Sequence, residues 1–339
     1  MDEQLLETIQ SIQSIFPADF IEAMWFNLVD DENFLEVLAR SLSIFPPIYL
    51  PILERDGDLY AVHLYPERPW EESSWVLLPH DQANTILVST SLRYLPGGMI
   101  TPPHYFLNRV EKFWPTILEL TNSIKGGILP EKLFFTDKTS DRTFLRAIYD
   151  REDGAARIAH AIEGIEDDGE ILQAIEKILQ ELPNNTLTLA AAAAARQKFG
   201  HSNFTQPAAQ VIMSEVFIGF NYLNELFMPE TVSEVLQLML SLALQEPDSD
   251  QPFRLLQDIS FNRVEDIFQF QGVAEEYLRI GEKNVALNQI RNGATIAANN
   301  FALNQEWCQL IARYTESIEP DGLSTRLALA AAEVIDLGA

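Results

Sequence analysis

Histidines and acids that could act as a general base gather in the N-terminal part of the chain. His63, His80 and His104 fall there, and Asp81 directly follows His80. A hydrolase pairs an imidazole with a carboxylate to move protons, so His63, His80 and Asp81 form one catalytic alternative. Their spacing matches no local metal motif such as His-Glu-x-x-His. We expect His63 on the outer face of a strand and His80-Asp81 in a turn, and we assign no catalytic residue, metal ligand or cofactor.

Other chemical signatures in the chain are incomplete. Cys308 is the only cysteine and follows Trp307 in an apolar helical pattern, so we expect it in the core. The acidic run at residues 166–170 lacks the alternating carboxylates of a calcium loop and is typical of a solvated loop. The sequence contains no Gly-x-Ser-x-Gly nucleophile motif, and its glycine pairs lack the lysine of a phosphate-binding loop.

A short segment rich in aromatic residues is the predicted binding site. Tyr65, Trp70 and Trp75 surround Pro66 and Pro69. Rigid rings beside prolines bury contact area at little entropic cost, which is typical of a protein-binding surface. The same rings can equally well cover the open face of a sheet, and the sequence leaves both interpretations open.

The net charge narrows the possible partners. The 23 Lys and Arg residues against 50 Asp and Glu give −27, which repels phosphate backbones and anionic lipid and attracts a basic protein. We therefore expect a protein partner and no nucleic acid or membrane. No apolar run approaches the roughly 20 residues of a membrane span. The acidic N-terminus and the single cysteine favour a cytoplasmic protein.

Apolar spacing predicts an α+β N-terminal domain over residues 1–127. Helical patterns fill residues 3–45 and 106–120, and a small antiparallel sheet of about four strands lies between them. Arg55-Asp56-Gly57-Asp58 is typical of a hairpin turn. The expected strands are residues 48–53, 60–64, 75–78 and 86–88.

The rest of the chain predicts only helices. After a linker over residues 128–140, an all-α domain over 141–339 suggests a solenoid or an irregular bundle. The expected helices cover residues 155–165, 171–182, 190–195, 211–223, 232–244, a hairpin at 270–298, and two terminal helices on either side of residues 319–322. A large apolar face on the last of them, residues 327–337, would instead suit a structural subunit of an assembly.

The hairpin at residues 270–298 resembles one tetratricopeptide unit. Ala274, Tyr277, Gly281 and Ala286 stand at offsets i, i+3, i+7 and i+12, as in that repeat. The resemblance implies two antiparallel helices joined by a turn beginning at Gly281, with Ala274 and Ala286 facing each other. Gly293 departs from the alanine usual in the repeat, so we describe the domain as repeat-like.

The N-terminal part is similar to the SMI1/KNR4 superfamily of protein-binding domains. Phe16-Pro17-Ala18-Asp19-Phe20 resembles its Leu-Pro-x-Asp-Tyr signature, and Gly57-Asp58-Leu59-Tyr60 resembles its Gly-Asp strand. Residues 91–95 lie where the family resumes a helix. The resemblance covers about a third of the chain. Because members of this family are toxin-immunity proteins or regulatory adaptors, it implies a non-catalytic adaptor, scaffold or immunity-type binder. The sequence identifies neither the partner nor the oligomeric state.

Overall fold

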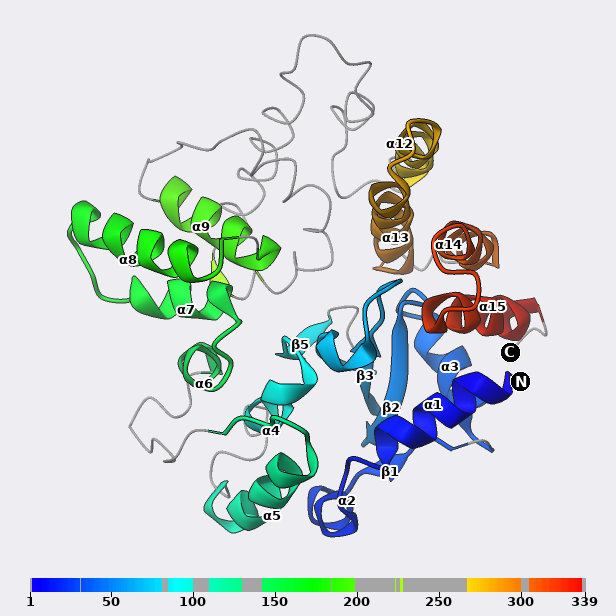
Figure 1. Ribbon diagram of the computed structural model, residues 1–339, viewed down its shortest axis with the longest axis horizontal. Helices are drawn as coiled ribbons and strands as arrows, with labels where there is room; N and C mark the ends of the chain where they lie inside the picture. The colour runs from blue at the N-terminus through cyan, green and yellow to red at the C-terminus, as the bar shows by residue number, and fades with distance from the viewer. Residues whose placement is uncertain are drawn as a thin grey trace. The chain divides into compact units, whose positions relative to one another are not determined.

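The computed structural model describes residues 2–30, 32–80, 85–99, 110–129, 142–183, 185–198, 223, 226–227, 267–299 and 305–336. The described part combines many helices with one antiparallel sheet, which confirms the predicted α+β class (Figure 1). The chain divides into two compact units. Unit 1 comprises Met1–Pro96, Arg109–Ile128 and Asp258–Ala339, and unit 2 comprises Gly97–Asn108 and Leu129–Gln257.

The helices carry the labels of Figure 1. They are α1 Glu3–Gln13, α2 Ala18–Met24, α3 Phe34–Leu42, α4 Leu95–Gly98, α5 Val110–Ser123, α6 Arg142–Tyr149, α7 Gly154–Ala161, α8 Asp168–Glu181, α9 Thr186–Lys198, α12 Ile267–Arg279, α13 Lys283–Asn299, α14 Gln305–Glu316 and α15 Leu323–Asp336. The strands are β1 Asn27–Leu28, β2 Tyr49–Arg55, β3 Asp58–His63, β4 Trp75–Leu78 and β5 Ile86–Ser89.

The sheet follows chain order, β1-β2-β3-β4-β5, with every neighbouring pair antiparallel. Asp56 and Gly57, with φ of 53° and 92°, form the tight turn between β2 and β3, and this two-residue geometry suits a right-twisted hairpin. The four predicted strands are present. The sheet also contains β1, which precedes the first expected strand at residues 48–53. Its two residues are too few to show the alternation that identifies a strand.

Unit 1 joins both ends of the chain. α1 buries Leu5, Ile9 and Ile12, and α15 packs against α1 and α3. Arg326 on α15 donates to Asp2, the N-cap of α1, at 2.6 Å. The C-terminal helices therefore belong with the sheet. This grouping differs from the predicted division, in which all residues after 141 form a separate helical domain.

The turn between α12 and α13 has the geometry that a glycine permits. Gly281 has φ of 90°. Its N–H donates to the carbonyl of Leu278 at 3.1 Å, and the N–H of Glu282 donates to the carbonyl of Tyr277 at 2.9 Å. This pair of bonds is the Schellman motif, which ends a helix at a left-handed residue. The turn lies at the predicted position.

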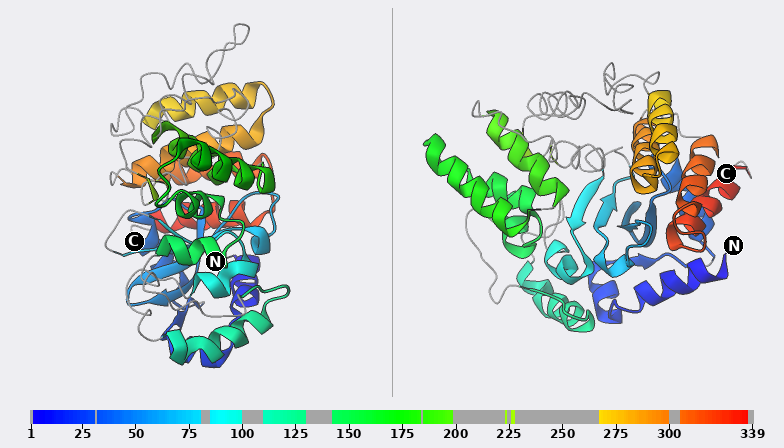
Figure 2. Two further views of the ribbon diagram at one scale, coloured as in Figure 1. Left: turned by 90° about the vertical axis from the view of Figure 1, so that its left-hand side faces the viewer. Right: turned by 45° about the horizontal axis from the view of Figure 1, so that its top comes forward.

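The two helices of this hairpin lie side by side in both views of Figure 2. Ala274 on α12 and Ala286 on α13 are both fully buried, as small residues are where helices approach closely. Gly293 serves the same purpose further along, because a Cβ there would lie 2.7 Å from the Trp307 ring of α14. Gly293, the residue that departs from the repeat pattern, therefore lets α14 pack closely against α13.

Unit 2 contains α6 to α9 among its described residues. α7 and α8 match the predicted helices at 155–165 and 171–182. Arg146 on α6 pairs with Asp153 at 2.7 Å, with both side chains buried, and Asp153 also caps α7 through the N–H of Ala156. The predicted helices at 211–223 and 232–244 lie outside the described residues, apart from Leu223.

No helix in the described part of the chain is both long and apolar enough to cross a bilayer.

Candidate functional site: an aromatic groove on unit 1

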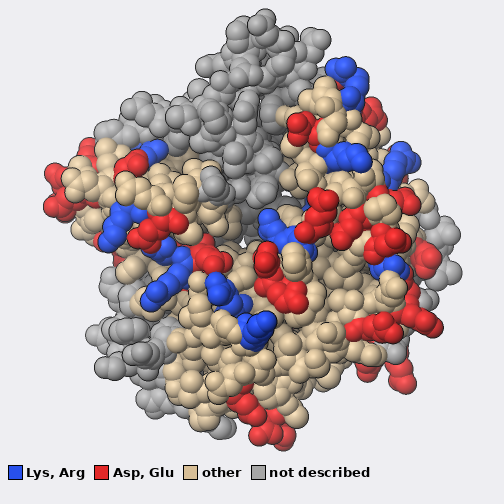
Figure 3. Space-filling model, viewed as in Figure 1, with Lys and Arg blue, Asp and Glu red and all other residues tan. Residues whose placement is uncertain are grey.

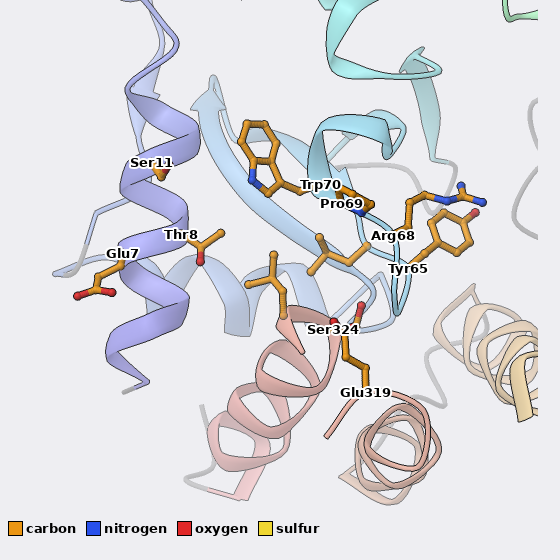
Figure 4. A pocket seen from close by; sticks show the side chains of 11 residues that line it. Glu7, Thr8, Ser11, Tyr65, Arg68, Pro69, Trp70, Glu319 and Ser324 are labelled. Carbon is orange, nitrogen blue, oxygen red and sulfur yellow. The ribbon is translucent and has the colours of Figure 1, made fainter. Parts of the chain in front are cut away.

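A groove of about 390 Å³ opens on unit 1 (Figure 4). Three segments line it: residues 7–11 of α1, residues 64–70 after β3, and residues 319–324 at the start of α15. We call this site the groove. Its volume lies at the lower end of the range for small-ligand pockets, roughly 300–1,000 Å³. It can therefore hold a small molecule or a few residues of a bound chain.

The wall formed by residues 64–70 is rigid for local reasons. Pro66 and Pro69 fix two backbone angles, and Glu67 holds a left-handed φ of 60°. Trp70 then begins a short 3-10 turn, Trp70–Glu72, and the Ser73 hydroxyl donates to the carbonyl of Pro69 at 3.3 Å. The Trp70 side chain is half-buried and lies across the groove from α1 (Figure 4).

Tyr65 occupies the same wall and is held by cations and an imidazole. The guanidinium of Arg68 lies 4.3 Å from the centre of its ring, and that of Arg291 lies 5.2 Å away. The centre of the His63 ring lies 4.3 Å from the centre of the Tyr65 ring. Two of the three predicted binding residues, Tyr65 and Trp70, thus belong to the lining of one groove. The Trp70 ring lies on the side of α1, and the Tyr65 ring points away from Glu319 (Figure 4).

Trp75 lies elsewhere. Its side chain is fully buried in β4, and its ring packs edge-on against Phe16 at 5.7 Å. In the folded unit it has no surface to offer a partner. For this one ring, the alternative of a cover over the sheet describes its position better.

The opposite part of the groove supplies polar groups. Thr8 and Ser11 project from α1, and Ser324 and Glu319 lie together at the start of α15 (Figure 4). Oε2 of Glu319 accepts a hydrogen bond from the backbone N–H of Glu67 at 3.0 Å. Sequence reasoning missed these groups, because no local pattern relates residues near 8, 67 and 319. Residues 319–322 carried only the signal of a helix boundary.

His63 is buried, with an exposed fraction of 2%, which corrects its predicted position on the outer face. It is the last residue of β3, an inner strand, and it lies between the rings of Tyr49 and Tyr65. Burial lowers the pKa of its imidazole well below 6.5, and the positive charges of Arg291 and Arg68 lower it further.

The other predicted histidine is at the far end of the same strand. His80 Nδ1 lies 2.8 Å from Oδ1 of Asp58, the first residue of β3. Asp58 and His63 are five residues apart along a strand, about 17 Å at 3.3 Å per residue. His63 and His80 therefore share no pocket, so the co-location that would favour the hydrolase alternative is absent for this pair. Asp81 and His104 lie outside the described residues.

Other reactive groups in the described part of the chain are isolated. No cluster of three or more His, Cys, Asp or Glu residues there could hold a metal ion. Cys308 is fully buried, which confirms its predicted place in the core, and burial raises the pKa of its thiol to about 12. A neutral thiol at physiological pH is a poor nucleophile.

Comparison of the chain with protein-family models, with curated proteins and with solved structures gives no match. The resemblances to the SMI1/KNR4 superfamily and to a tetratricopeptide unit therefore stay predictions from short motifs.

Proposed function

We propose that the chain acts through protein contacts, as an adaptor, scaffold or immunity-type binder of a basic partner in the cytoplasm, and that the groove is its contact site. The observation that supports this most is Trp70, held half-buried on a rigid wall across from the hydroxyl groups of α1. Large rings in partly desolvated pockets, with a few polar groups nearby, are typical of interface hot spots. Such a contact needs no catalytic residue.

The charge of the protein suits a basic partner. On the face shown in Figure 3, acidic side chains gather over the region of α1, α14 and α15, where the groove has two of its walls. A net charge of −27 would steer a cationic protein toward the surface and raise its association rate.

The two alternatives have less support. The hydrolase alternative would have to work without a shared pocket for His63 and His80. The structural-subunit alternative requires a large apolar face on the last helix. α15 instead buries Leu327, Ala328 and Ala331 in unit 1, and Leu329 is its large exposed apolar side chain, at 50%.

Affinity capture from the native cell tests the proposal when it is run with two matched variants. Trp70→Ala removes the ring in the groove. Trp25→Ala removes a ring that is 66% exposed and lies outside the groove. We expect Trp70→Ala to weaken binding of the captured partner by about 2 kcal/mol, roughly 30-fold, and Trp25→Ala to leave it unchanged. Full binding by Trp70→Ala would refute the groove as the contact site, and a loss confined to Trp25→Ala would place the contact at Trp25.

A salt series with the same partner tests the electrostatic part. Affinity and association rate should fall as ionic strength rises, because the screening length shrinks from about 10 Å at 0.1 M to about 3 Å at 1 M. The contribution of Trp70 should persist at every salt concentration. Affinity that is independent of salt would show that the partner is not recognised by charge.

A further inference from the structure

We propose that the groove recognises one arginine or lysine side chain on an extended segment of the partner, with Glu319 as the receptor for its charge. This inference rests on the proposed function and deepens it, because it names the group that the groove takes. The occupant follows from the carboxylate, the rings and the distribution of charge along the lining.

Glu319 is a carboxylate held in place before any ligand arrives. Its Oε2 accepts the N–H of Glu67, and its side chain packs over Gly322, where a Cβ would lie 2.2 Å from Oε2. Glycine thus leaves the space that the carboxylate occupies. Within the described residues, Oε1 of Glu319 has no hydrogen-bonding partner. A fixed, half-buried carboxylate with a free oxygen binds a cationic donor more strongly than a mobile surface carboxylate does.

The start of α15 would otherwise favour an anion. Backbone N–H groups and the helix dipole make a helix N-terminus attractive to negative charge. Here the carboxylate of Glu319 already lies against Gly322, immediately before α15. A second anion would be repelled by it, so the unsatisfied charge in this part of the groove is negative.

The other charged residues that line the groove also favour a cation as the ligand. Glu7 adds a second carboxylate, and Arg68 is the cation among the lining residues. Arg68 lies over the Tyr65 ring at 4.3 Å, and Figure 4 shows both side chains on the far side of the wall from Glu319. Arg68 therefore leaves Glu319 available to a cation from outside.

The rest of the groove suits the long stem of such a side chain. Arginine and lysine carry a charged head on an apolar stem that packs along hydrophobic surface. Trp70, Leu64 and Leu323 offer that surface in the same groove as Glu319, and an indole face also attracts a cation. The Ser324 hydroxyl, on a residue 5% exposed, lines the groove and has no hydrogen-bonding partner in the described part of the chain. It can accept a further N–H from the ligand.

Peptides of matched shape test the charge requirement. The probes are three acetylated and amidated pentapeptides with a central arginine, citrulline or glutamate between glycines, titrated against the full chain and followed by its tryptophan fluorescence. We expect the arginine peptide to bind in a saturable way. The citrulline peptide has the same shape without the charge and should bind at least tenfold more weakly. The glutamate peptide should not bind.

A charge-only variant tests Glu319 itself. Glu319→Gln keeps an oxygen that can accept the N–H of Glu67 and removes the negative charge. Glu316→Gln makes the same change at an exposed position on α14 outside the groove. We expect Glu319→Gln to lower the affinity for the arginine peptide at least tenfold and Glu316→Gln to leave that affinity unchanged. Both variants should melt near the wild-type temperature. Equal binding of the citrulline peptide, an unaffected Glu319→Gln, or no binding of the arginine peptide would overturn the inference. Preferred binding of the glutamate peptide would also overturn it, because the start of α15 would then be an anion site.

The captured partner separates this inference from the proposed function. If Trp70→Ala weakens binding of the partner and Glu319→Gln does not, the groove is the contact site, and the inference that Glu319 binds a cation is wrong. If Trp70→Ala leaves the partner bound, the proposed function fails and the inference fails with it.

Discussion

Glu67 and Glu319 are 252 positions apart in the chain, yet the backbone N–H of Glu67 donates to Oε2 of Glu319 at 3.0 Å. The bond joins the aromatic wall of the groove to the turn before α15. A second link, from Arg326 to Asp2 at 2.6 Å, joins α15 to the start of α1. The three segments that line the groove are thus connected by side chains from both ends of the chain.

The first prediction concerns this tether. Glu319→Ala removes the acceptor and should lower the free energy of unfolding by about 1 kcal/mol, the usual net contribution of one hydrogen bond. Glu319→Gln retains an acceptor and should stay closer to the wild type. Urea denaturation of the three proteins measures the difference. Equal losses for both variants would show that charge, and not the hydrogen bond, carries the contribution.

Local patterns predicted most of the elements around this site. Alternation at Tyr60, Val62 and Leu64 identified β3, short apolar segments identified β2, β4 and β5, and the Asp56-Gly57 pair identified the turn between β2 and β3. The residue types at positions 65 and 70 suggested either a contact surface or a cover over the sheet, and both residues line the groove. That the groove is a contact surface stays a proposal.

The predictions that were wrong or missing depend on contacts between segments that are distant in the sequence. The pattern of β3 puts His63 on the face opposite the apolar residues, where a solvent-exposed side chain was expected. Arg291 of α13 and the rings of Tyr49 and Tyr65 nevertheless lie around it. A sequence pattern assigns faces to a strand and does not show that both are covered. The grouping of α15 with α1 and the contribution of Glu319 to the groove are hidden for the same reason, because segments 250 or more residues apart carry no mutual signal.

The second prediction concerns Gly293. An alanine Cβ at this position would lie 2.7 Å and 2.9 Å from Cη2 and Cζ3 of Trp307. Although alanine is the better helix former by about 1 kcal/mol, overpacking a rigid ring should outweigh that gain. Gly293→Ala should therefore destabilise the protein by about 1–2 kcal/mol.

Thermal and urea unfolding in a double-mutant cycle with Trp307→Phe check this expectation. The smaller ring lacks the two atoms that the new Cβ would meet, so Gly293→Ala should cost less in that background. The same loss in both backgrounds would exclude Trp307 as the cause.

The third prediction concerns the alanine at the contact of α12 and α13. Ala286 is fully buried, so Ala286→Leu should overpack the hairpin and cost about 1–3 kcal/mol. Asn284→Leu makes a similar change at an exposed position of the same helix and should have little effect. Equal melting temperatures for the two variants would refute the assigned contact.

The fourth prediction concerns Cys308. Because burial excludes solvent and raises the pKa of the thiol to about 12, an aromatic disulfide reagent should label it only as fast as the protein opens. Labelling should become rapid and reach one thiol per chain in denaturing urea. Immediate labelling of the native protein at neutral pH would show an accessible thiol.

The last prediction is a pH dependence that originates at His63. The groups around its imidazole are the rings of Tyr49 and Tyr65 and the guanidinium groups of Arg68 and Arg291. None of these groups changes charge between pH 5 and 7.5. Among the groups at this position, the imidazole is therefore the one whose protonation changes in this pH range. Its pKa lies well below 6.5 in the folded protein, because burial and the two arginines disfavour the protonated form.

The sign of the effect follows from the difference in bound protons. Well above pH 6.5 the imidazole is neutral in both states. As the pH falls below 6.5, the unfolded chain takes up a proton that the folded chain resists, so the free energy of unfolding decreases by up to about 1.4 kcal/mol per pH unit. His63→Phe keeps a neutral ring at this position and cannot bind the proton. Urea denaturation of both proteins at pH 7.5, 6.5 and 5.5 measures the difference, in which the carboxylates common to both cancel. We expect the wild type to lose more stability than His63→Phe between pH 6.5 and 5.5, and parallel losses would show that His63 is protonated as readily in the folded protein as in the unfolded chain.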